Sequence, residues 1–213
     1  MTSNAFDNFH YGYKRLDALY IHFLEESDHK DELKELTREV ILLQLVALIE
    51  AYKEDLTRQL TQGSLKELFE NDKRLRKQIL KHLMSASRIL TSWDDLFEEM
   101  VDVALEKYKK GAFEDWMNKI SKTFSFSSGL VSNSSQKAHF VEYLATRNIV
   151  AHHQGKITQR YLNRTKKFYE QSTTPVPSIG SSRSLDNAYC KNAMSCIFQV
   201  VSKFDQGAIT MLT

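Results

Sequence analysis

The stretch REVILLQLVALIEAYKEDL, residues 38–56, decides the fold. Its apolar residues recur at steps of three and four, which is the spacing of one face of an α-helix. The pattern extends on both sides and predicts a helix over about residues 30–62, which Gly63 ends. A first apolar stripe consists of Leu33, Leu36, Val40, Leu43 and Ala47, and a second consists of Ile41, Leu45, Leu48, Tyr52 and Leu56. Because this helix is apolar on two faces, we expect it to be the central helix of a bundle.

Helical periodicity also accounts for most of the remaining chain. Glycine and proline are scarce, at seven and two of 213 residues. Possible capping boxes at Ser64 with Glu67 and at Ser92 with Asp95 mark two helix starts. The expected helices cover about residues 5–25, 30–62, 64–84, 92–109, 112–122, 136–153, 156–171 and 186–206. The sequence therefore predicts an all-α fold.

Two serine-rich stretches interrupt the helices. SFSSGLVSNSSQ, residues 125–136, is predicted to be a loop, and TTPVPSIGSS, residues 173–182, contains both prolines. We divide the chain into a helical domain, residues 1–171, a linker or surface loop, 172–185, and a C-terminal helical region, 186–213. We expect that last region to pack on the same bundle, although a separately docked arm fits the linker equally well.

Composition excludes several classes of protein. The net charge of +2 is too small for a broad electrostatic grip on nucleic acid, so any basic surface must be local. The most apolar run, residues 40–49, is too short to span a bilayer. Cys190 and Cys196 fall on opposite sides of one expected helix, which argues against a disulfide framework. We therefore expect a cytoplasmic protein without a membrane segment.

The stretch RNIVAHHQG, residues 147–155, concentrates polar side chains at the end of an expected helix. An arginine followed by a histidine at about this spacing also occurs twice elsewhere, so the spacing alone is weak evidence. Asn148 and His152, however, lie about 40° apart on one helix face, and Gly155 is placed to end the helix behind them. Arg147 lies about 140° from His152 and would need its long side chain, or the helix end, to reach the same point.

Basic residues surround this stretch. Residues 137–171 contain seven lysines and arginines against two glutamates, so a phosphate group is expected to bind here. A metal enzyme is not indicated, because Glu26 and His29 form a single Glu-x-x-His and neither His-Glu-x-x-His nor paired Cys-x-x-Cys occurs. Nucleotide-binding glycine loops are also missing from the sequence, and no cofactor is expected.

RNIVAHHQGKITQRYL resembles the motif of the HEPN superfamily (higher eukaryote and prokaryote nucleotide-binding), and most closely its RiboL-PSP type. The stretch REVILLQLVALIEAYKEDL also resembles the long second helix of such domains. The resemblance covers about residues 1–170 and leaves the C-terminal region unaccounted for. It implies a metal-independent endoribonuclease that forms a homodimer, with the two motifs facing each other across one cleft.

Carried over to this chain, the resemblance assigns catalysis to Arg147, Asn148 and His152. His152 would exchange protons with the ribose 2′-hydroxyl or the leaving oxygen, Arg147 would neutralise the phosphorane, and Asn148 would orient the imidazole or the phosphate. His153 also meets the permitted spacing and remains the alternate. Glu50 is either a supporting partner for an arginine or part of the solvated edge of its helix.

The residues expected to bind RNA follow the motif along the chain. They are Lys156, Arg160, Arg164, Lys166 and Lys167. This assignment suits a ribonuclease from a toxin-antitoxin or phage-defence system, restrained by an antitoxin or another regulatory protein. The alternative is a non-catalytic HEPN-like module that dimerises or binds a partner. A purely structural explanation is also open, in which the histidines favour the helix dipole and Arg147 pairs with an acidic neighbour such as Glu142.

Overall fold

The computed structural model describes residues 2–25, 29–86, 92–109, 111–127 and 134–212. Within these ranges the chain forms nine α-helices and one π-helical turn, with no β-strand. The all-α fold predicted from the sequence is therefore confirmed. Among the residues described, no helix is long and apolar enough to cross a membrane.

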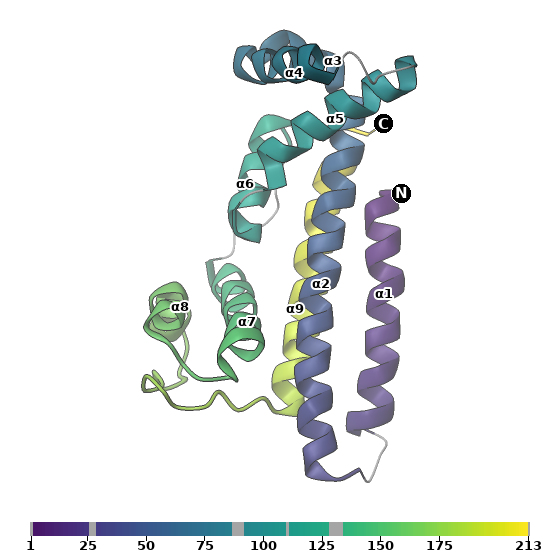
Figure 1. The fold of residues 1–213 in the computed structure, drawn as a ribbon. Helices are drawn as coiled ribbons and strands as arrows, with labels where there is room; N and C mark the ends of the chain where they lie inside the picture. The colour runs from purple at the N-terminus through teal and green to yellow at the C-terminus, as the bar shows by residue number, and fades with distance from the viewer. Residues whose placement is uncertain (1, 26–28, 87–91, 110, 128–133, 213) are drawn as a thin grey trace.

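Three long helices form the main bundle. Helices α1 (Asn4–Tyr20), α2 (Asp31–Gly63) and α9 (Asn187–Ile209) lie side by side along most of their length (Figure 1). Helix α2 contacts α1, α5, α6, α7 and α9, and it ends at Gly63, so its predicted bounds and central position are confirmed. The π-helical turn η1 (Ile21–Glu25) extends α1.

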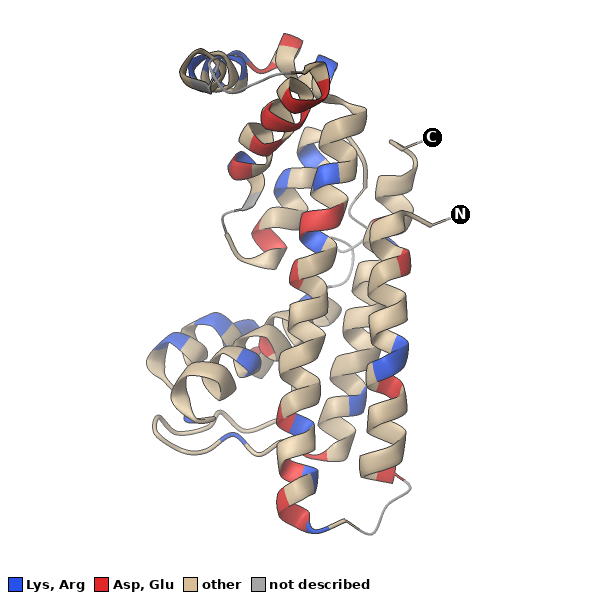
Figure 2. Ribbon diagram, turned by 45° about the vertical axis from the view of Figure 1, so that its right-hand side comes forward, with Lys and Arg blue, Asp and Glu red and all other residues tan. Residues whose placement is uncertain are grey.

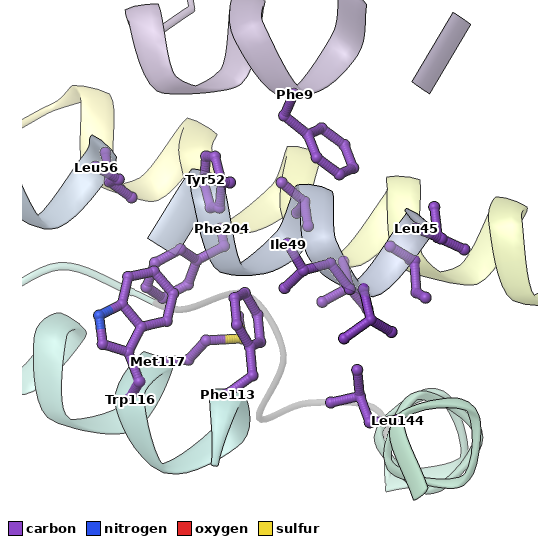
Figure 3. Close-up of a cluster of buried hydrophobic side chains, with 14 of the residues drawn as sticks. Phe9, Leu45, Ile49, Tyr52, Leu56, Phe113, Trp116, Met117, Leu144 and Phe204 are labelled. Atoms are coloured by element: carbon purple, nitrogen blue, oxygen red, sulfur yellow. The ribbon is translucent and has the colours of Figure 1, made fainter. Parts of the chain in front are cut away.

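Aromatic and aliphatic side chains from five helices fill the core around α2 (Figure 3). Tyr52 of α2 contacts the rings of Phe9 from α1 and Trp116 from α6, and Trp116 in turn contacts Phe204 of α9. The side chains of Ile49 and Leu56 are fully buried. Burial of this much apolar surface is the main force that holds the helices together.

Only one of the two apolar stripes predicted on α2 is fully covered. The second stripe is buried except for Leu48, which is partly exposed. In the first stripe, Leu33, Leu36 and Val40 remain 39%, 56% and 36% exposed. The prediction that both faces of α2 are covered was wrong at this end, because α1 and α9 occupy only one side of the helix there.

Four shorter helices follow α2 and lie around its C-terminal half (Figure 1). They are α3 (Leu65–Asn71), α4 (Lys73–Ala86), α5 (Trp93–Lys109) and α6 (Phe113–Thr123). The capping box predicted at Ser92 and Asp95 is present, with two reciprocal bonds of 3.1 Å from backbone to side chain. The side chain of Ser64 makes no capping hydrogen bond, so the box predicted there does not form.

Asp72 breaks the single helix predicted over residues 64–84. Its Oδ1 accepts the backbone N–H groups of Arg74 at 3.1 Å and Leu75 at 2.9 Å. An aspartate in this position satisfies the free N–H groups at the start of a new helix, so α3 ends and α4 begins. Periodicity does not reveal this break, because the apolar spacing continues through it.

Helices α7 (Ser134–His153) and α8 (Gln159–Gln171) pack against each other beside α2 and α9. Part of the loop predicted over residues 125–136 falls on positions outside the described residues, and α7 starts two residues earlier than predicted. Helix α8 starts later than predicted, because the Thr158 side chain caps it by accepting the N–H of Tyr161 at 3.1 Å. The following segment, 172–186, which we call the strap, leads to α9, and α9 packs on α1, α2 and α7.

Candidate functional site

The RNIVAHHQG stretch occupies the last turns of α7 and the turn that follows. The helix ends at His153, and the next two residues adopt left-handed backbone angles, φ 51° at Gln154 and φ 72° at Gly155. The N–H of Gly155 donates to the carbonyl of Ile149 at 3.0 Å. Gly155 therefore ends the helix as predicted, because glycine adopts this conformation without a steric penalty.

A hollow of about 260 Å³ lies between the end of α7 and the start of α8. Asn148, His152 and His153 line it from α7, and Arg160 and Arg164 line it from α8. Both imidazoles are exposed to solvent. Two groups that can exchange protons near neutral pH thus share one hollow with two guanidinium groups and an amide.

Arg147 does not line this hollow. Its Nη1 donates to the Oδ1 of Asn148 at 3.2 Å, and its Nε is buried without a hydrogen-bond partner among the described residues. Arg147 therefore reaches the site only through the amide of Asn148, and its long side chain does not bring it to the point where His152 lies. It does not pair with Glu142 in this structure, because that carboxylate faces other partners.

Basic residues are concentrated on α8 (Figure 2), and together with Lys156 just before it they include both unpaired and paired cations. Lys156, Arg160 and Lys167 are exposed, and no ion pair is found for them among the described residues. Arg164 lines the hollow, but its Nη2 lies 3.0 Å and 3.3 Å from the two carboxylate oxygens of Glu114 on α6. Lys166 lies outside the hollow and forms a loose pair with Glu170 at 3.7 Å.

Glu50 lies on α2 and is not among the residues that line the hollow. Its Oε2 accepts from Lys53 of the same helix at 3.2 Å, and its side chain is 52% exposed. It lines a different depression together with Thr57 and Leu105. Of the two roles considered for Glu50, the structure shows the solvated edge of a helix and a lysine partner rather than an arginine.

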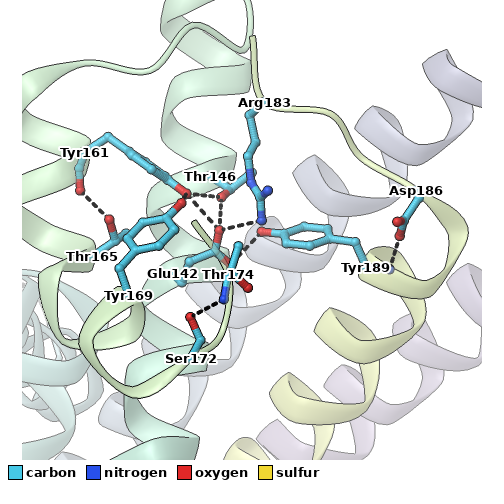
Figure 4. A network of polar contacts seen from close by, with 10 residues as sticks. All are labelled: Glu142, Thr146, Tyr161, Thr165, Tyr169, Ser172, Thr174, Arg183, Asp186 and Tyr189. Carbon is cyan, nitrogen blue, oxygen red and sulfur yellow. Dashed lines mark hydrogen bonds and ion pairs between the residues drawn. The ribbon is translucent and has the colours of Figure 1, made fainter. Parts of the chain in front are cut away.

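The sequence analysis missed a buried polar network around Glu142 (Figure 4), which shares Tyr161 with the lining of the hollow. The carboxylate of Glu142 on α7 is completely buried. It accepts hydrogen bonds from Thr146 at 2.8 Å, Tyr161 at 2.8 Å and Tyr189 at 2.9 Å, and from the guanidinium of Arg183 at 3.2 Å. The one available signal was a glutamate inside the otherwise apolar run FVEYLA.

The environment keeps the members of this network in fixed protonation states. Burial, together with the nearby Glu142 carboxylate, raises the pKa of both Tyr161 and Tyr189 well above the usual tyrosine value, so both stay protonated as donors. Burial is the largest single influence on Arg183 and would lower its pKa, but the Glu142 carboxylate and the nearby tyrosines together raise that pKa by more, so the guanidinium stays charged. The network is therefore a paired charge surrounded by neutral donors.

The network attaches the strap to the turn that carries the histidines. The N–H of Arg183 donates to the carbonyl of Gly155 at 2.9 Å, and Ile157 exchanges two bonds of 2.9 Å with Ser181 and Gly180. The strap is thus bound by its backbone to the residues directly after His153, and by the Arg183 side chain to α7. This double attachment restricts the position of the turn.

Within the ranges that the structure covers, no group of three or more histidine, cysteine, aspartate or glutamate side chains is arranged to hold a metal ion. No protein family model, curated protein or solved structure matches the chain. The function must therefore be argued from the site.

Proposed function

We propose that this protein is a metal-independent endoribonuclease of the HEPN type and that the hollow between α7 and α8 holds the scissile phosphate. The observation that carries the proposal is the shared lining of that hollow by His152, His153, Asn148, Arg160 and Arg164. Histidine supplies acid-base chemistry near neutral pH, and guanidinium groups match the charge and geometry of phosphate.

In the proposed reaction an imidazole, which we assign to His152, removes the proton from a ribose 2′-hydroxyl. The freed oxygen attacks the adjacent phosphorus, the bond to the 5′-oxygen breaks, and a second imidazole protonates that leaving oxygen. The products are a 2′,3′-cyclic phosphate and a 5′-hydroxyl. Arg160 and Arg164 would offset the charge on the phosphorane, and Arg147 would act by fixing the Asn148 amide.

The second imidazole has two sources in this proposal. One is His153 of the same chain, and the other is a second copy of His152 supplied by a homodimer. The exposed stripe on α2 supports a dimer, because Leu33, Leu36, Val40, Leu43 and Ala47 follow the alternating spacing of three and four found in coiled-coil seams. A second copy of α2 is the occupant that we propose for this stripe.

RNA cleavage in the presence of EDTA tests the activity. We expect the wild-type protein to leave 2′,3′-cyclic ends, and His152→Ala to lose about 100-fold or more in rate because a general acid or base contributes at least that much. Arg147→Ala and Asn148→Ala should also be slower. The matched control is Arg15→Ala, because Arg15 precedes His22 in one of the other arginine-histidine pairs and is exposed on α1. Cleavage that needs a metal, or that survives in both His152→Ala and His153→Ala, would refute the proposal.

A cytoplasmic role in growth arrest or phage defence, under the control of an antitoxin or another regulatory protein, is part of the same proposal. Expression of the wild-type protein should arrest growth, and His152→Ala should relieve the arrest. The α2 stripe also suits the second candidate, a non-catalytic module that dimerises or binds a partner. Arrest that is unchanged in His152→Ala but abolished in Leu36→Glu would favour that candidate.

A further inference from the structure

Helix α4 carries an unusual concentration of positive charge at the far end of the molecule from the α7–α8 turn (Figures 1 and 2). Its residues, 73–86, include five lysines and arginines and no acidic residue. We use the name α4 basic face for the residues that line one shallow depression of about 610 Å³ on it. These residues are Lys73, Arg76, Lys77, Leu80, Lys81, Met84 and Ser85.

The α4 basic face is the outer side of an amphipathic helix, and the apolar inner side of that helix packs against the rest of the protein. Leu75 and Ile79 are completely buried against the rest of the protein. The cations recur at steps of three and four along the outer side, which places the Cβ atoms of neighbouring basic residues about 5–6 Å apart. Leu80 and Met84 are the apolar residues between them, 48% and 80% exposed.

These charges are not neutralised by their surroundings. Among the described residues, no ion pair is found for Lys73, Lys77 or Lys81, nor for the two arginines of α4. Several of the nearby acidic residues have partners of their own. Asp72 pairs with Lys107, Glu99 pairs with His82, and Glu98 and Asp102 both pair with Arg58.

We propose that the α4 basic face binds the phosphate backbone of RNA, as an anchoring site separate from the hollow that contains His152. Unpaired cations spaced along one line attract a polyanion without regard to its sequence. An anionic membrane fits less well, because the apolar side of α4 is buried and cannot insert into lipid. An acidic helical protein fits less well too, because a helix-in-groove partner needs a continuous apolar stripe.

This inference rests on the proposed ribonuclease function for the identity of the polyanion, and it adds a preference for long substrates. Helix α7 packs against α2, α8 and α9, whereas α4 packs against α3 and α5 at the other end of the molecule (Figure 1). A tetranucleotide in the hollow should not reach α4, but a long single strand should contact both sites.

Binding is tested first, with a 2′-O-methyl RNA that keeps every phosphate but lacks the attacking hydroxyl. In the triple variant Lys73→Gln, Lys77→Gln, Lys81→Gln, the slope of log K against log salt concentration should become shallower by about 2, since each lost contact to a single strand removes about 0.7. The control is Lys14→Gln, Arg15→Gln, Lys30→Gln, which removes the same charge from exposed positions on and near α1 and should leave the slope unchanged.

Cleavage kinetics give the second measurement. On a long single strand the α4 triple variant should raise KM about tenfold and leave kcat unchanged, whereas on a tetranucleotide neither constant should change. Equal slopes in the α4 and control variants would overturn the inference. It would also be overturned if the α4 substitutions weakened binding to phosphatidylserine vesicles or to polyglutamate but not to RNA. Absence of cleavage would refute only the ribonuclease, because the salt dependence is measured without it.

Discussion

Glu142 shows how a single residue can connect four parts of the chain. Its completely buried carboxylate accepts hydrogen bonds from side chains of α7, α8, the strap and α9. A buried charge of this kind is tolerated only when it is paired and hydrogen-bonded, so each partner depends on the others.

We expect Glu142→Ala to lower the free energy of unfolding by about 3–5 kcal/mol, because it leaves the Arg183 guanidinium largely buried without its carboxylate. Denaturation in urea measures this loss. The control is Lys191→Met, which removes an exposed ion pair with Glu25 and should change the free energy of unfolding far less, because solvent screens such a pair. A Glu142→Ala protein as stable as the Lys191→Met protein would show that the network contributes little.

The two cysteines give a second test at the residue scale. Burial raises the pKa of Cys190 to about 12 and that of Cys196 to about 11. The reactive thiolate is therefore a very small fraction of either residue near neutral pH. We expect both thiols of the native protein to react slowly with an aromatic disulfide reagent at mildly alkaline pH, and both to react rapidly after unfolding in urea. Rapid reaction of the native protein would contradict the burial of these side chains.

Among the helices, α4 depends most clearly on a single cap. Asp72 accepts two backbone N–H groups at the start of α4 and pairs with Lys107 of α5. These contacts, led by the backbone bond from Leu75 and the bond from Lys107, hold the pKa of Asp72 below its ordinary value of 3.8. The same residue thus starts α4 and connects it to α5.

The lowered pKa makes this contribution dependent on pH. The folded state favours the ionised carboxylate, so its stabilisation is fully present above the unfolded pKa of about 3.8 and is lost as the pH falls through the lower folded value. We expect Asp72→Ala to be about 1 kcal/mol less stable than wild type at neutral pH. The difference should shrink below about pH 4. Asp72→Asn keeps a capping side chain but loses the charge, so its unfolding temperature should lie between those of the wild type and Asp72→Ala. A difference that does not change with pH would rule out the ionised cap.

At the scale of the whole molecule, polar and apolar surfaces are distributed unevenly. The hollow with the histidines, the exposed stripe on α2 and the α4 basic face lie on different parts of one continuous bundle (Figures 1 and 2). Apolar residues that stay exposed along a helix at coiled-coil spacing indicate a partner helix, because solvation of such a stripe is unfavourable.

We therefore expect the wild-type protein to be a dimer by sedimentation or light scattering, and Leu36→Glu to be a monomer because it places a charge in the seam. Tyr11→Glu is the matched control, since Tyr11 is 70% exposed on α1 and lies outside the stripe. A wild-type monomer, or a dimer that persists in Leu36→Glu, would show that a second copy of α2 does not cover the stripe.

Most helices could be predicted because a helix depends on neighbours three and four residues away. The bounds of α2, the reciprocal cap at Ser92 and the end of α7 at Gly155 follow from such local patterns. The break at Asp72 is local too, but it was missed. The apolar spacing continues through Asp72 without interruption, so it gives no sign that this side chain caps a new helix.

The candidate site was predictable only in part. Asn148 and His152 share a helix face by their spacing, and both line the hollow. The turn that brings Arg160 and Arg164 beside them, and the Glu114 that pairs with Arg164, depend on how α6, α7 and α8 pack. The sequence also could not show that Arg147 contacts Asn148 rather than the hollow itself.

By itself, the sequence determined an all-α chain, a central helix and a cluster of histidines and cations at a helix end, because each depends on residue type and short spacing. Only the tertiary structure decided which stripe of α2 is covered and which residues surround Glu142. Thr146, Tyr161, Arg183 and Tyr189 come from separate segments of the chain. A buried carboxylate needs donors close by in space. Which segments of the chain supply those donors depends on how the whole bundle packs, and local sequence patterns do not show it.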